Sequence, residues 1–171
     1  KILAQKLAQD PMAIKRFMHE ARLTLHLEHR GLVKIYSYGQ LEGGAPYILM
    51  EFLVGESLRS CIARAAPLPI ESCLAIGFQL AESLSLAHKH GIVHRDLKPD
   101  NVMLIEDATA PKGQRAKVFD FGIAKSVSEL GQETLGGVKT STDAILGTPR
   151  YMSPEQCRGA AKVDVKTDVY A

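Results

Sequence analysis

The sequence predicts an α+β protein. Two runs of β-branched and aromatic residues, 32–36 and 47–53, lie on either side of a Gly-Gly-Ala-Pro turn and indicate neighbouring strands. Apolar residues recur at helical spacing over 11–25 and again over 70–90. After the second stretch, the loop from His94 to Asn101 combines an acid, a cation, a proline and an amide within eight residues. A loop of this composition can carry out chemistry.

The first helical stretch has a recognisable start. Asp10 is a preferred N-cap residue, and Pro11 suits the first helical position because that position needs no backbone N–H. A shorter helix is expected from Ser57 to Ala65, where Pro67 and Pro69 then interrupt the pattern.

The stretch over 70–90 carries two apolar stripes, one of which contains Ile70, Leu74 and Phe78. Two stripes predict a helix that is buried on most sides. Gly91 is expected as the C′ residue that ends it. We expect this rigid helix to present the polar loop that follows it.

Two further strands are expected at 102–105 and 116–119, with 106–115 as the turn between them. The turn is interpreted as a surface insertion with no catalytic role. Asp120 follows the second strand directly and lies 19 residues after Asn101 (120 − 101). One hairpin can therefore bring these two side chains together.

The composition excludes several classes of function. With 171 residues, a net charge of +2 and 46% hydrophobic residues, the chain fits one ordinary globular domain. It has no basic arm and no Trp, so we expect no nucleic-acid partner. No apolar run approaches the roughly 20 residues that span a bilayer, so we expect no membrane segment and no signal peptide in this chain.

The three cysteines, Cys61, Cys73 and Cys157, are odd in number and widely spaced. This pattern predicts reduced thiols rather than a disulfide framework or a zinc site. It favours a reducing, cytoplasmic compartment.

The residues from His94 to Asn101 read H-R-D-L-K-P-D-N and resemble the catalytic loop of eukaryotic-type protein kinases, in the style of the bacterial Ser/Thr protein kinases. The resemblance implies that Asp96 receives the proton of the substrate hydroxyl and that Asn101 holds Mg²⁺. Asp120 begins a D-F-G motif and is implied as the second metal ligand. Lys98 is implied to contact the transferred phosphate, which favours a Ser/Thr kinase over a Tyr kinase.

The same resemblance implies an ATP site near the start of the chain. Lys1 would be the lysine of a V-A-I-K motif, and Glu20, 19 residues later (20 − 1), would pair with it from the first helix. The other implied nucleotide contacts are Met50 at the inner pocket, the backbone of Glu51, Phe52 and Leu53 at the adenine, and Met103.

Residues 120–155 resemble a kinase activation segment that ends in Ser-Pro-Glu where kinases have Ala-Pro-Glu. Thr148 is implied to hydrogen-bond Asp96 and Lys98. Further on, Asp168 is implied to anchor the backbone of the catalytic loop.

Arg95 implies a regulatory mechanism, because kinases with this arginine pair it with a phosphate on the activation segment. The expected phosphorylation sites are Thr142 first and Thr140 second, with Ser141 as a further candidate.

The resemblance implies a bilobal kinase-like fold that is incomplete at both ends. Residues 1–53 would be the remnant of the small lobe with the hinge, and residues 54–171 the first part of the large lobe. The expected activity is transfer of the ATP γ-phosphate to Ser or Thr hydroxyls of proteins, with a homodimer that phosphorylates itself in trans. The expected location is the cytoplasm, including the cytoplasmic part of a membrane-anchored kinase.

Three alternatives stay open. A pseudokinase scaffold would share the fold but should have lost Asp96, Asn101 or Asp120. A truncated, noncatalytic interaction protein would retain these residues without activity. A small-molecule phosphotransferase can share the H-x-D and Asn pattern, but it would normally lack Lys98-Pro99 and the long segment that ends at Glu155.

Overall fold

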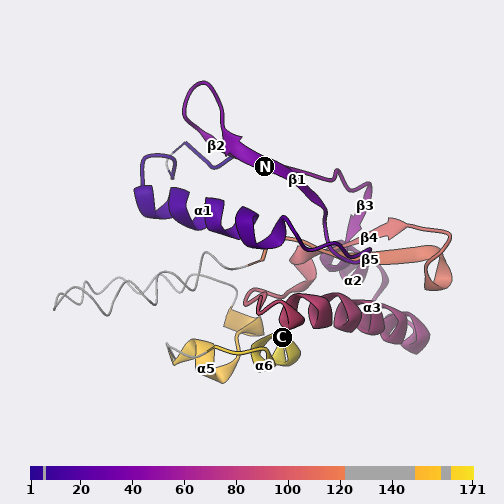
Figure 1. Ribbon diagram of the computed structural model, residues 1–171. Helices are drawn as coiled ribbons and strands as arrows, with labels where there is room; N and C mark the ends of the chain where they lie inside the picture. Colours follow the sequence, from indigo (N-terminus) through magenta and orange to yellow (C-terminus); the bar gives the residue numbers. More distant parts are fainter. Residues whose placement is uncertain (6, 122–148, 159–162) are drawn as a thin grey trace.

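The computed structural model describes residues 1–5, 7–121, 149–158 and 163–171 (Figure 1). The helices are α1 (Pro11–Thr24), α2 (Leu58–Ala65), α3 (Ile70–Lys89), α5 (Pro154–Cys157) and α6 (Lys166–Tyr170). Short 3₁₀ turns are η1 (Pro99–Asn101), η2 (Pro111–Gly113) and η4 (Pro149–Tyr151). The strands are β1 (Ile35–Gln40), β2 (Pro46–Met50), β3 (Gly55–Ser57), β4 (Val102–Glu106) and β5 (Gln114–Val118).

Helix α1 begins as the sequence predicts. The Asp10 carboxylate accepts a hydrogen bond of 2.8 Å from the backbone N–H of Met12, and Pro11 occupies the first turn. The buried face of α1 carries Phe17 and Ala21, which pack in one cluster with residues of β1 and β2. Figure 1 shows α1 beneath this hairpin. The helix is therefore held against the sheet by its apolar face.

The antiparallel pair β1–β2 differs from the predicted strands at its edges. Strand β1 starts at Ile35, because Leu32 pairs with Val118 of β5 in an isolated bridge instead. Strand β2 ends at Met50, so residues 51–53 leave the sheet as a connection. Ile2 bridges to Tyr47, which adds the start of the chain to the edge of β2.

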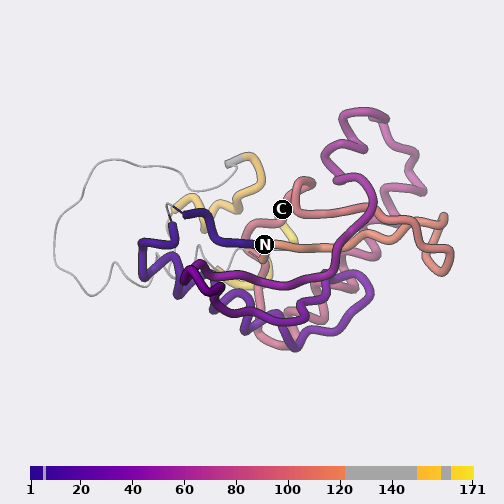
Figure 2. The backbone as a smooth tube through the Cα atoms, turned by 90° about the horizontal axis from the view of Figure 1, so that it is seen from above, coloured from indigo at the N-terminus to yellow at the C-terminus, as the bar shows by residue number. Residues whose placement is uncertain are grey.

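A second antiparallel sheet has the order β3-β4-β5. The β4–β5 hairpin matches the prediction closely, whereas β3 was not expected. Gly55 is needed there, because a Cβ at this position would lie 2.1 Å from the carbonyl oxygen of Leu104. Figures 1 and 2 place the tip of this hairpin and α1 at opposite ends of the molecule. The predicted boundary after residue 53 falls between the two sheets and stays a prediction.

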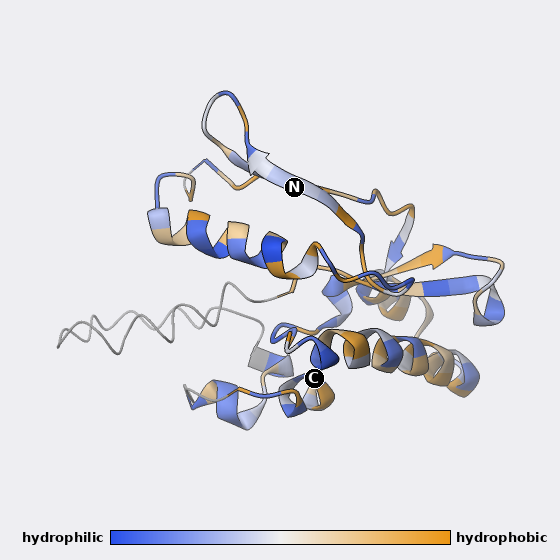
Figure 3. Cartoon of the chain, viewed as in Figure 1, coloured by the Kyte–Doolittle hydropathy of each residue, from blue (hydrophilic) through white to orange (hydrophobic). Residues whose placement is uncertain are grey.

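Helix α3 has the predicted bounds, but the expectation that it is buried on most sides is wrong. Ile70, Leu74 and Phe78 are 74%, 68% and 65% exposed. Only the opposite face is covered, where Gln79 donates to the carbonyl of Gln114 and accepts from the N–H of Ala116. Figure 3 shows hydrophobic positions, in orange, along α3. The described residues supply a partner for only one of its two apolar stripes.

Among the described residues, α3 is also the one helix whose length and hydropathy would suffice to cross a membrane. We expected no apolar stretch of about 20 residues, but α3 is 20 residues long and meets this criterion. Length and composition are weak evidence for a membrane span, and the hydrogen bonds of Gln79 place α3 against β5.

The turn between β4 and β5 is organised around Asp107. Its carboxylate accepts hydrogen bonds from the N–H and the hydroxyl of Thr109, at 2.8 and 2.6 Å, and from Nε of Arg115 at 2.8 Å. The hydrogen bonds from Thr109, followed by that from Arg115, lower the pKa of Asp107 to about 2. The turn is a fixed structure on the surface.

We predict that Asp107→Asn lowers the free energy of unfolding at neutral pH. A carboxyl whose folded pKa is lowered contributes stability above its ordinary pKa of 3.8, and this contribution is lost as the pH falls toward 2. The difference between the wild type and D107N should therefore shrink as the pH falls below about 4. Urea unfolding at several pH values measures it. The exposed neighbour Glu106 provides the control variant E106Q, and equal pH dependence of D107N and wild type would contradict the prediction.

Candidate active site

The catalytic loop is anchored by a buried carboxylate. Asp168 in α6, whose side chain is 0% exposed, accepts the backbone N–H groups of His94 and Arg95, both at 2.8 Å. Nε2 of His88, at the end of α3, lies 2.7 Å from the same carboxylate. Three polar groups from α3 and the loop therefore meet on one buried side chain, as a buried carboxylate requires.

The backbone at Arg95 adopts a conformation that needs this support. Its φ is 64°, a left-handed value that is uncommon for a residue with a side chain. Its N–H is held by Asp168, and its carbonyl oxygen accepts a 2.7 Å hydrogen bond from Nε2 of Gln156. Such strain persists where the surroundings fix both sides of the residue.

His94 is a structural part of the loop. Its ring is buried and stacks on Phe121, with the ring centroids 4.7 Å apart. Nδ1 lies 3.3 Å from the backbone N–H of Asp96, so it acts as acceptor, and Nε2 then donates to the carbonyl oxygen of Phe119 at 3.2 Å. Burial lowers the pKa of His94, in agreement with a neutral ring in this tautomer.

Asp96 lies among the other polar residues of the loop. Oδ2 of Asp96 is 3.2 Å from Nζ of Lys98 and 3.4 Å from Nδ2 of Asn101. Nδ2 of Asn101 also donates to the backbone carbonyl of Asp96 at 2.8 Å. The structure thus brings together the acid, the cation and the amide that the sequence singled out.

Lys1 lies between two carboxylates. Its Nζ is 2.7 Å from Oδ1 of Asp120 and 3.4 Å from Oε1 of Glu20. Burial alone would lower the pKa of Lys1, but the two carboxylates outweigh it and raise the pKa. Burial also raises the pKa of Glu20, and the charge of Lys1 offsets this only in part. The predicted pair of Lys1 and Glu20 is present, with Asp120 as a third member.

Asn101 and Asp120 flank the open end of the β4–β5 hairpin. The N–H of Phe119 donates to the carbonyl oxygen of Asn101 at 3.1 Å, which places the strand end beside η1. The amide nitrogen of Asn101 donates to the carbonyl oxygen of Asp96, so Oδ1 is the atom that Asn101 can offer to a cation. The contact of Asp120 with Lys1 is made by Oδ1, which lies 2.7 Å from Nζ. Two such oxygen ligands, completed by phosphate oxygens, suit Mg²⁺. Among the described residues there is no cluster of three or more His, Cys, Asp or Glu that could hold a metal ion without such additional ligands.

An open cleft of about 400 Å³ adjoins Lys1. Its lining includes all the positions expected to contact the nucleotide at the hinge: Met50, Glu51, Phe52, Leu53 and Met103. The backbone N–H of Glu51 is already bonded to the carbonyl of Lys34, and the side chain of Glu51 pairs with Lys117 at 2.6 Å. In the described part of the chain, the carbonyl oxygen of Glu51 and the backbone N–H of Leu53 make no such hydrogen bond, so both are available to hydrogen-bond a ligand.

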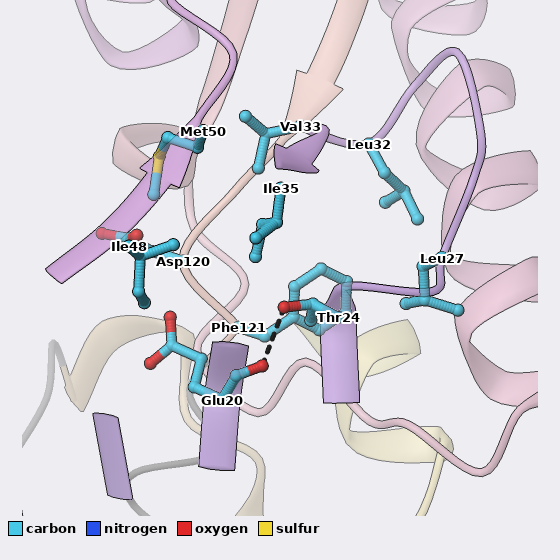
Figure 4. Close-up of a pocket in the computed structure, with 10 residues that line it drawn as sticks. All are labelled: Glu20, Thr24, Leu27, Leu32, Val33, Ile35, Ile48, Met50, Asp120 and Phe121. Atoms are coloured by element: carbon cyan, nitrogen blue, oxygen red, sulfur yellow. Dashed lines mark hydrogen bonds between the residues drawn. The ribbon is translucent and has the colours of Figure 1, made fainter. Parts of the chain in front are cut away.

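Behind this cleft lies a small inner cavity of about 10 Å³, with room for about one water molecule. Figure 4 shows Glu20 and Asp120 at this cavity, together with Phe121. Met50 lines both the inner cavity and the open cleft, so it lies between them. Phe121 is buried in a core cluster together with Leu32 and Ala87, and it lines the inner cavity.

Several predicted positions fall outside the described residues. They are Thr140, Ser141, Thr142 and Thr148. Residues at the far end of the same segment are described: Ser153 caps α5, and its hydroxyl accepts from the N–H of Gln156 at 3.4 Å.

The sequence reasoning missed two residues that hold the site. Gln156 joins α5 to the catalytic loop through the carbonyl of Arg95, and His88 supports Asp168. The S-P-E-Q sequence from Ser153 was a detectable capping-box signal for Gln156. For His88 no local signal existed, because its partner is 80 residues away.

Comparison with known proteins agrees with this geometry. The family model described as "Protein kinase domain" matches residues 1–171. The chain is 37% identical to the Serine/threonine-protein kinase PknB of Mycolicibacterium smegmatis, over 100% of this chain and 26% of that protein. It is 37% identical to Serine/threonine-protein kinase pkn3 of Myxococcus xanthus, over 100% of this chain and 30% of that protein. The chain thus spans between about a quarter and a third of these relatives.

Solved structures give the same result. The PknI kinase domain of Mycobacterium tuberculosis superposes with a TM-score of 0.68 at 28% identity, covering 98% of this chain and 57% of that one. The α+β fold of this chain is that of the solved kinase domains. The chain belongs to the protein kinase family, and its relatives are bacterial serine/threonine kinases.

We predict that Asp168→Asn destabilises the protein by about 3 kcal/mol, because the amide can accept only one of the two loop N–H groups and turns its own N–H₂ toward the other. Denaturant unfolding measures this loss. Asp164→Asn is the matched control in the same segment, since Asp164 is exposed and its side chain accepts the N–H of Lys166. A loss for D168N no larger than that for D164N would show that the anchor is unimportant.

Proposed function

We propose that the protein transfers the γ-phosphoryl group of ATP to serine or threonine hydroxyls of other proteins. The observation that carries this proposal is the position of Lys1 between Glu20 and Asp120. A lysine fixed in this way at the edge of an open cleft suits nucleotide phosphates. Asp96 and Lys98 lie in the loop that follows α3, and Asn101 at the end of this loop accepts a hydrogen bond from Phe119, which lines the cleft.

In the proposed reaction the oxygen of the acceptor hydroxyl forms a bond to the γ-phosphorus as the bond between the γ-phosphorus and the bridging oxygen of ADP breaks. Asp96 orients the hydroxyl and accepts its proton. Lys98, whose Nζ lies 3.2 Å from Oδ2 of Asp96, neutralises charge on the transferred group. Lys1 binds the nucleotide phosphates and is held there by Glu20.

Asn101 and Asp120 are proposed to hold Mg²⁺ through their side-chain oxygens. The ion would neutralise charge on the β- and γ-phosphates. Asp120 also contacts Lys1 at 2.7 Å, so one side chain would link the metal to the phosphate-binding lysine.

Two observations favour a protein acceptor over the other readings. All of Asp96, Asn101 and Asp120 are retained, which disfavours a pseudokinase scaffold. The segment from η4 to α5 is joined to the catalytic loop by Gln156, which supports an acceptor surface built next to Asp96. A small-molecule phosphotransferase has no need of this segment.

We predict that Lys1→Met in the full-length protein weakens ATP binding or turnover by at least about 100-fold, because no other cation is held between Glu20 and Asp120 in the described residues. Titration calorimetry with ATP and Mg²⁺ and a peptide phosphorylation assay measure both quantities. Lys34→Met removes an exposed lysine that pairs only with Glu28 and serves as control. Comparable activity of K1M and K34M would refute the role of Lys1.

We further propose that the protein is regulated by phosphorylation of Thr142, with Thr140 and then Ser141 as further sites. Arg95 supports this, because its backbone is fixed in the loop by Asp168 and Gln156 while its cationic side chain remains to pair with a phosphate. Self-phosphorylation in trans requires two copies of the protein to meet. We therefore propose a transient homodimer.

The double variant Thr140→Ala/Thr142→Ala is predicted to lose most of its activity and its phosphate at this segment, because Arg95 then has no phosphate to pair with. Phosphopeptide mass spectrometry and peptide kinetics on the full-length protein measure this. The rate of self-phosphorylation should rise with protein concentration, as a reaction in trans requires. A fully active double variant would contradict the regulatory proposal.

We also propose a reducing, cytoplasmic environment for this part of the protein. Cys61, Cys73 and Cys157 are all free thiols, and Cys73 and Cys157 are exposed. Exposed thiols are typical of compartments that keep them reduced.

A further inference from the structure

An exposed ion pair joins α2 to the catalytic loop, and neither of its residues belongs to the machinery described above. Nε and Nη2 of Arg59, in the first turn of α2, donate to Oδ2 of Asp100 at 3.3 and 3.0 Å. Nε also lies 3.4 Å from Oδ1. The side chains are 43% and 46% exposed. The planar guanidinium thus occupies both oxygens of an accessible carboxylate.

This pair is close to where an acceptor hydroxyl must arrive. Asp100 lies in η1, four residues after Asp96 in the same loop. Four residues of chain span at most about 14 Å, so Asp100 lies no farther than this from Asp96. A side chain within about four residues of the acceptor hydroxyl in an extended peptide could therefore reach Asp100. The hydroxyl of Tyr151, in η4, also interacts with the Arg59 guanidinium. Three segments, α2, the catalytic loop and η4, therefore meet at this spot.

The charges at this spot decide what it can bind. An unpaired Asp100 would attract a basic side chain of a peptide. Here the hydrogen bond from Arg59 lowers the pKa of Asp100, so the carboxylate stays ionised and paired. A peptide arginine that displaced Arg59 would replace one ion pair with Asp100 by another. The displaced guanidinium of Arg59 would then lie close to the guanidinium of the peptide. Such an exchange gains little free energy.

We propose that the Arg59–Asp100 ion pair determines acceptor specificity by withholding Asp100 from basic side chains, so that the protein disfavours acceptor peptides with Arg or Lys near the target hydroxyl. The inference rests on the proposed kinase function and names a substrate class for it. It assigns Arg59 a specificity-determining position and no part in the chemical step.

Helix α2 itself provides a matched control. Arg64, five residues after Arg59, forms an exposed ion pair with Glu56 of β3. This second pair has the same chemistry and lies on the same short helix, but it does not involve the catalytic loop. Arg64→Ala removes the same charge from the surface as Arg59→Ala.

The test measures kcat/KM of the full-length protein for a serine peptide flanked by alanines. A set of related peptides carries a single Arg at each position from about four before to about four after the serine. For wild type, Arg should lower or leave unchanged kcat/KM at every position. R59A should raise the ratio of Arg to Ala peptides about fivefold at one or two neighbouring positions. R59Q, which keeps a polar side chain there, should give the same rise, and R59A/D100N should return the ratio to the wild-type value.

Two results would overturn this inference and leave the proposed function intact. One is a ratio of kcat/KM for Arg and Ala peptides that R59A and R59Q leave unchanged at every position. The other is an equal rise of this ratio in R64A, which would reveal a general effect of surface charge. A wild-type preference for Arg peptides would also overturn it. Absence of phosphoryl transfer to every peptide by the wild type would instead overturn the proposed function, and this inference with it.

Discussion

The buried carboxylate of Asp168 is the interaction on which the site depends. It accepts two backbone N–H groups of the catalytic loop and the imidazole of His88, all within 2.8 Å. These bonds fix the loop at the residue with the left-handed backbone, Arg95, immediately before Asp96. The other end of the loop is fixed by the bond from Phe119 to Asn101. The loop that contains Asp96 is thus held at one end by α6 and at the other by the residue after β5, which limits the motions of this side chain.

The second constraint is electrostatic. Lys1 forms ion pairs with both Glu20 and Asp120. A single ammonium group therefore connects helix α1 to the segment that follows β5. Glu20 depends most on this cation, because burial raises the pKa of its carboxyl and the charge of Lys1 opposes that rise. A nucleotide phosphate that draws on Lys1 would change the balance between these carboxylates. The cleft, the inner cavity and the catalytic loop are therefore linked by charge as well as by packing.

Much of this arrangement could be predicted from local patterns. The capping by Asp10, the bounds of α3 and the β4–β5 hairpin follow from spacing and residue type, which report on near neighbours along the chain. The pair of Lys1 and Glu20 was predicted instead from the resemblance to protein kinases. Strand β3 could not be predicted, since three residues that begin with glycine carry no strand pattern, and only β4 gives them a partner.

The remaining failures have a common cause. The exposure of Phe78, the bond from Gln156 to Arg95 and the pairing of Arg59 with Asp100 depend on which segments distant in sequence come to lie together. Hydrophobic periodicity shows which side of α3 is apolar, but it does not show what covers that side. A lone Arg on a short helix likewise gives no sign that its partner is a residue of the catalytic loop.

The proposed transfer of a phosphoryl group from ATP to a protein hydroxyl can be followed atom by atom. The most direct measurement incubates the full-length protein with a serine peptide and ATP labelled with ¹⁸O at all oxygens of the γ-phosphate, followed by mass spectrometry. We expect a phosphoserine in which the three oxygens from the transferred group are labelled and the serine oxygen is not. Labelled inorganic phosphate alone, with no labelled phosphopeptide, would contradict it.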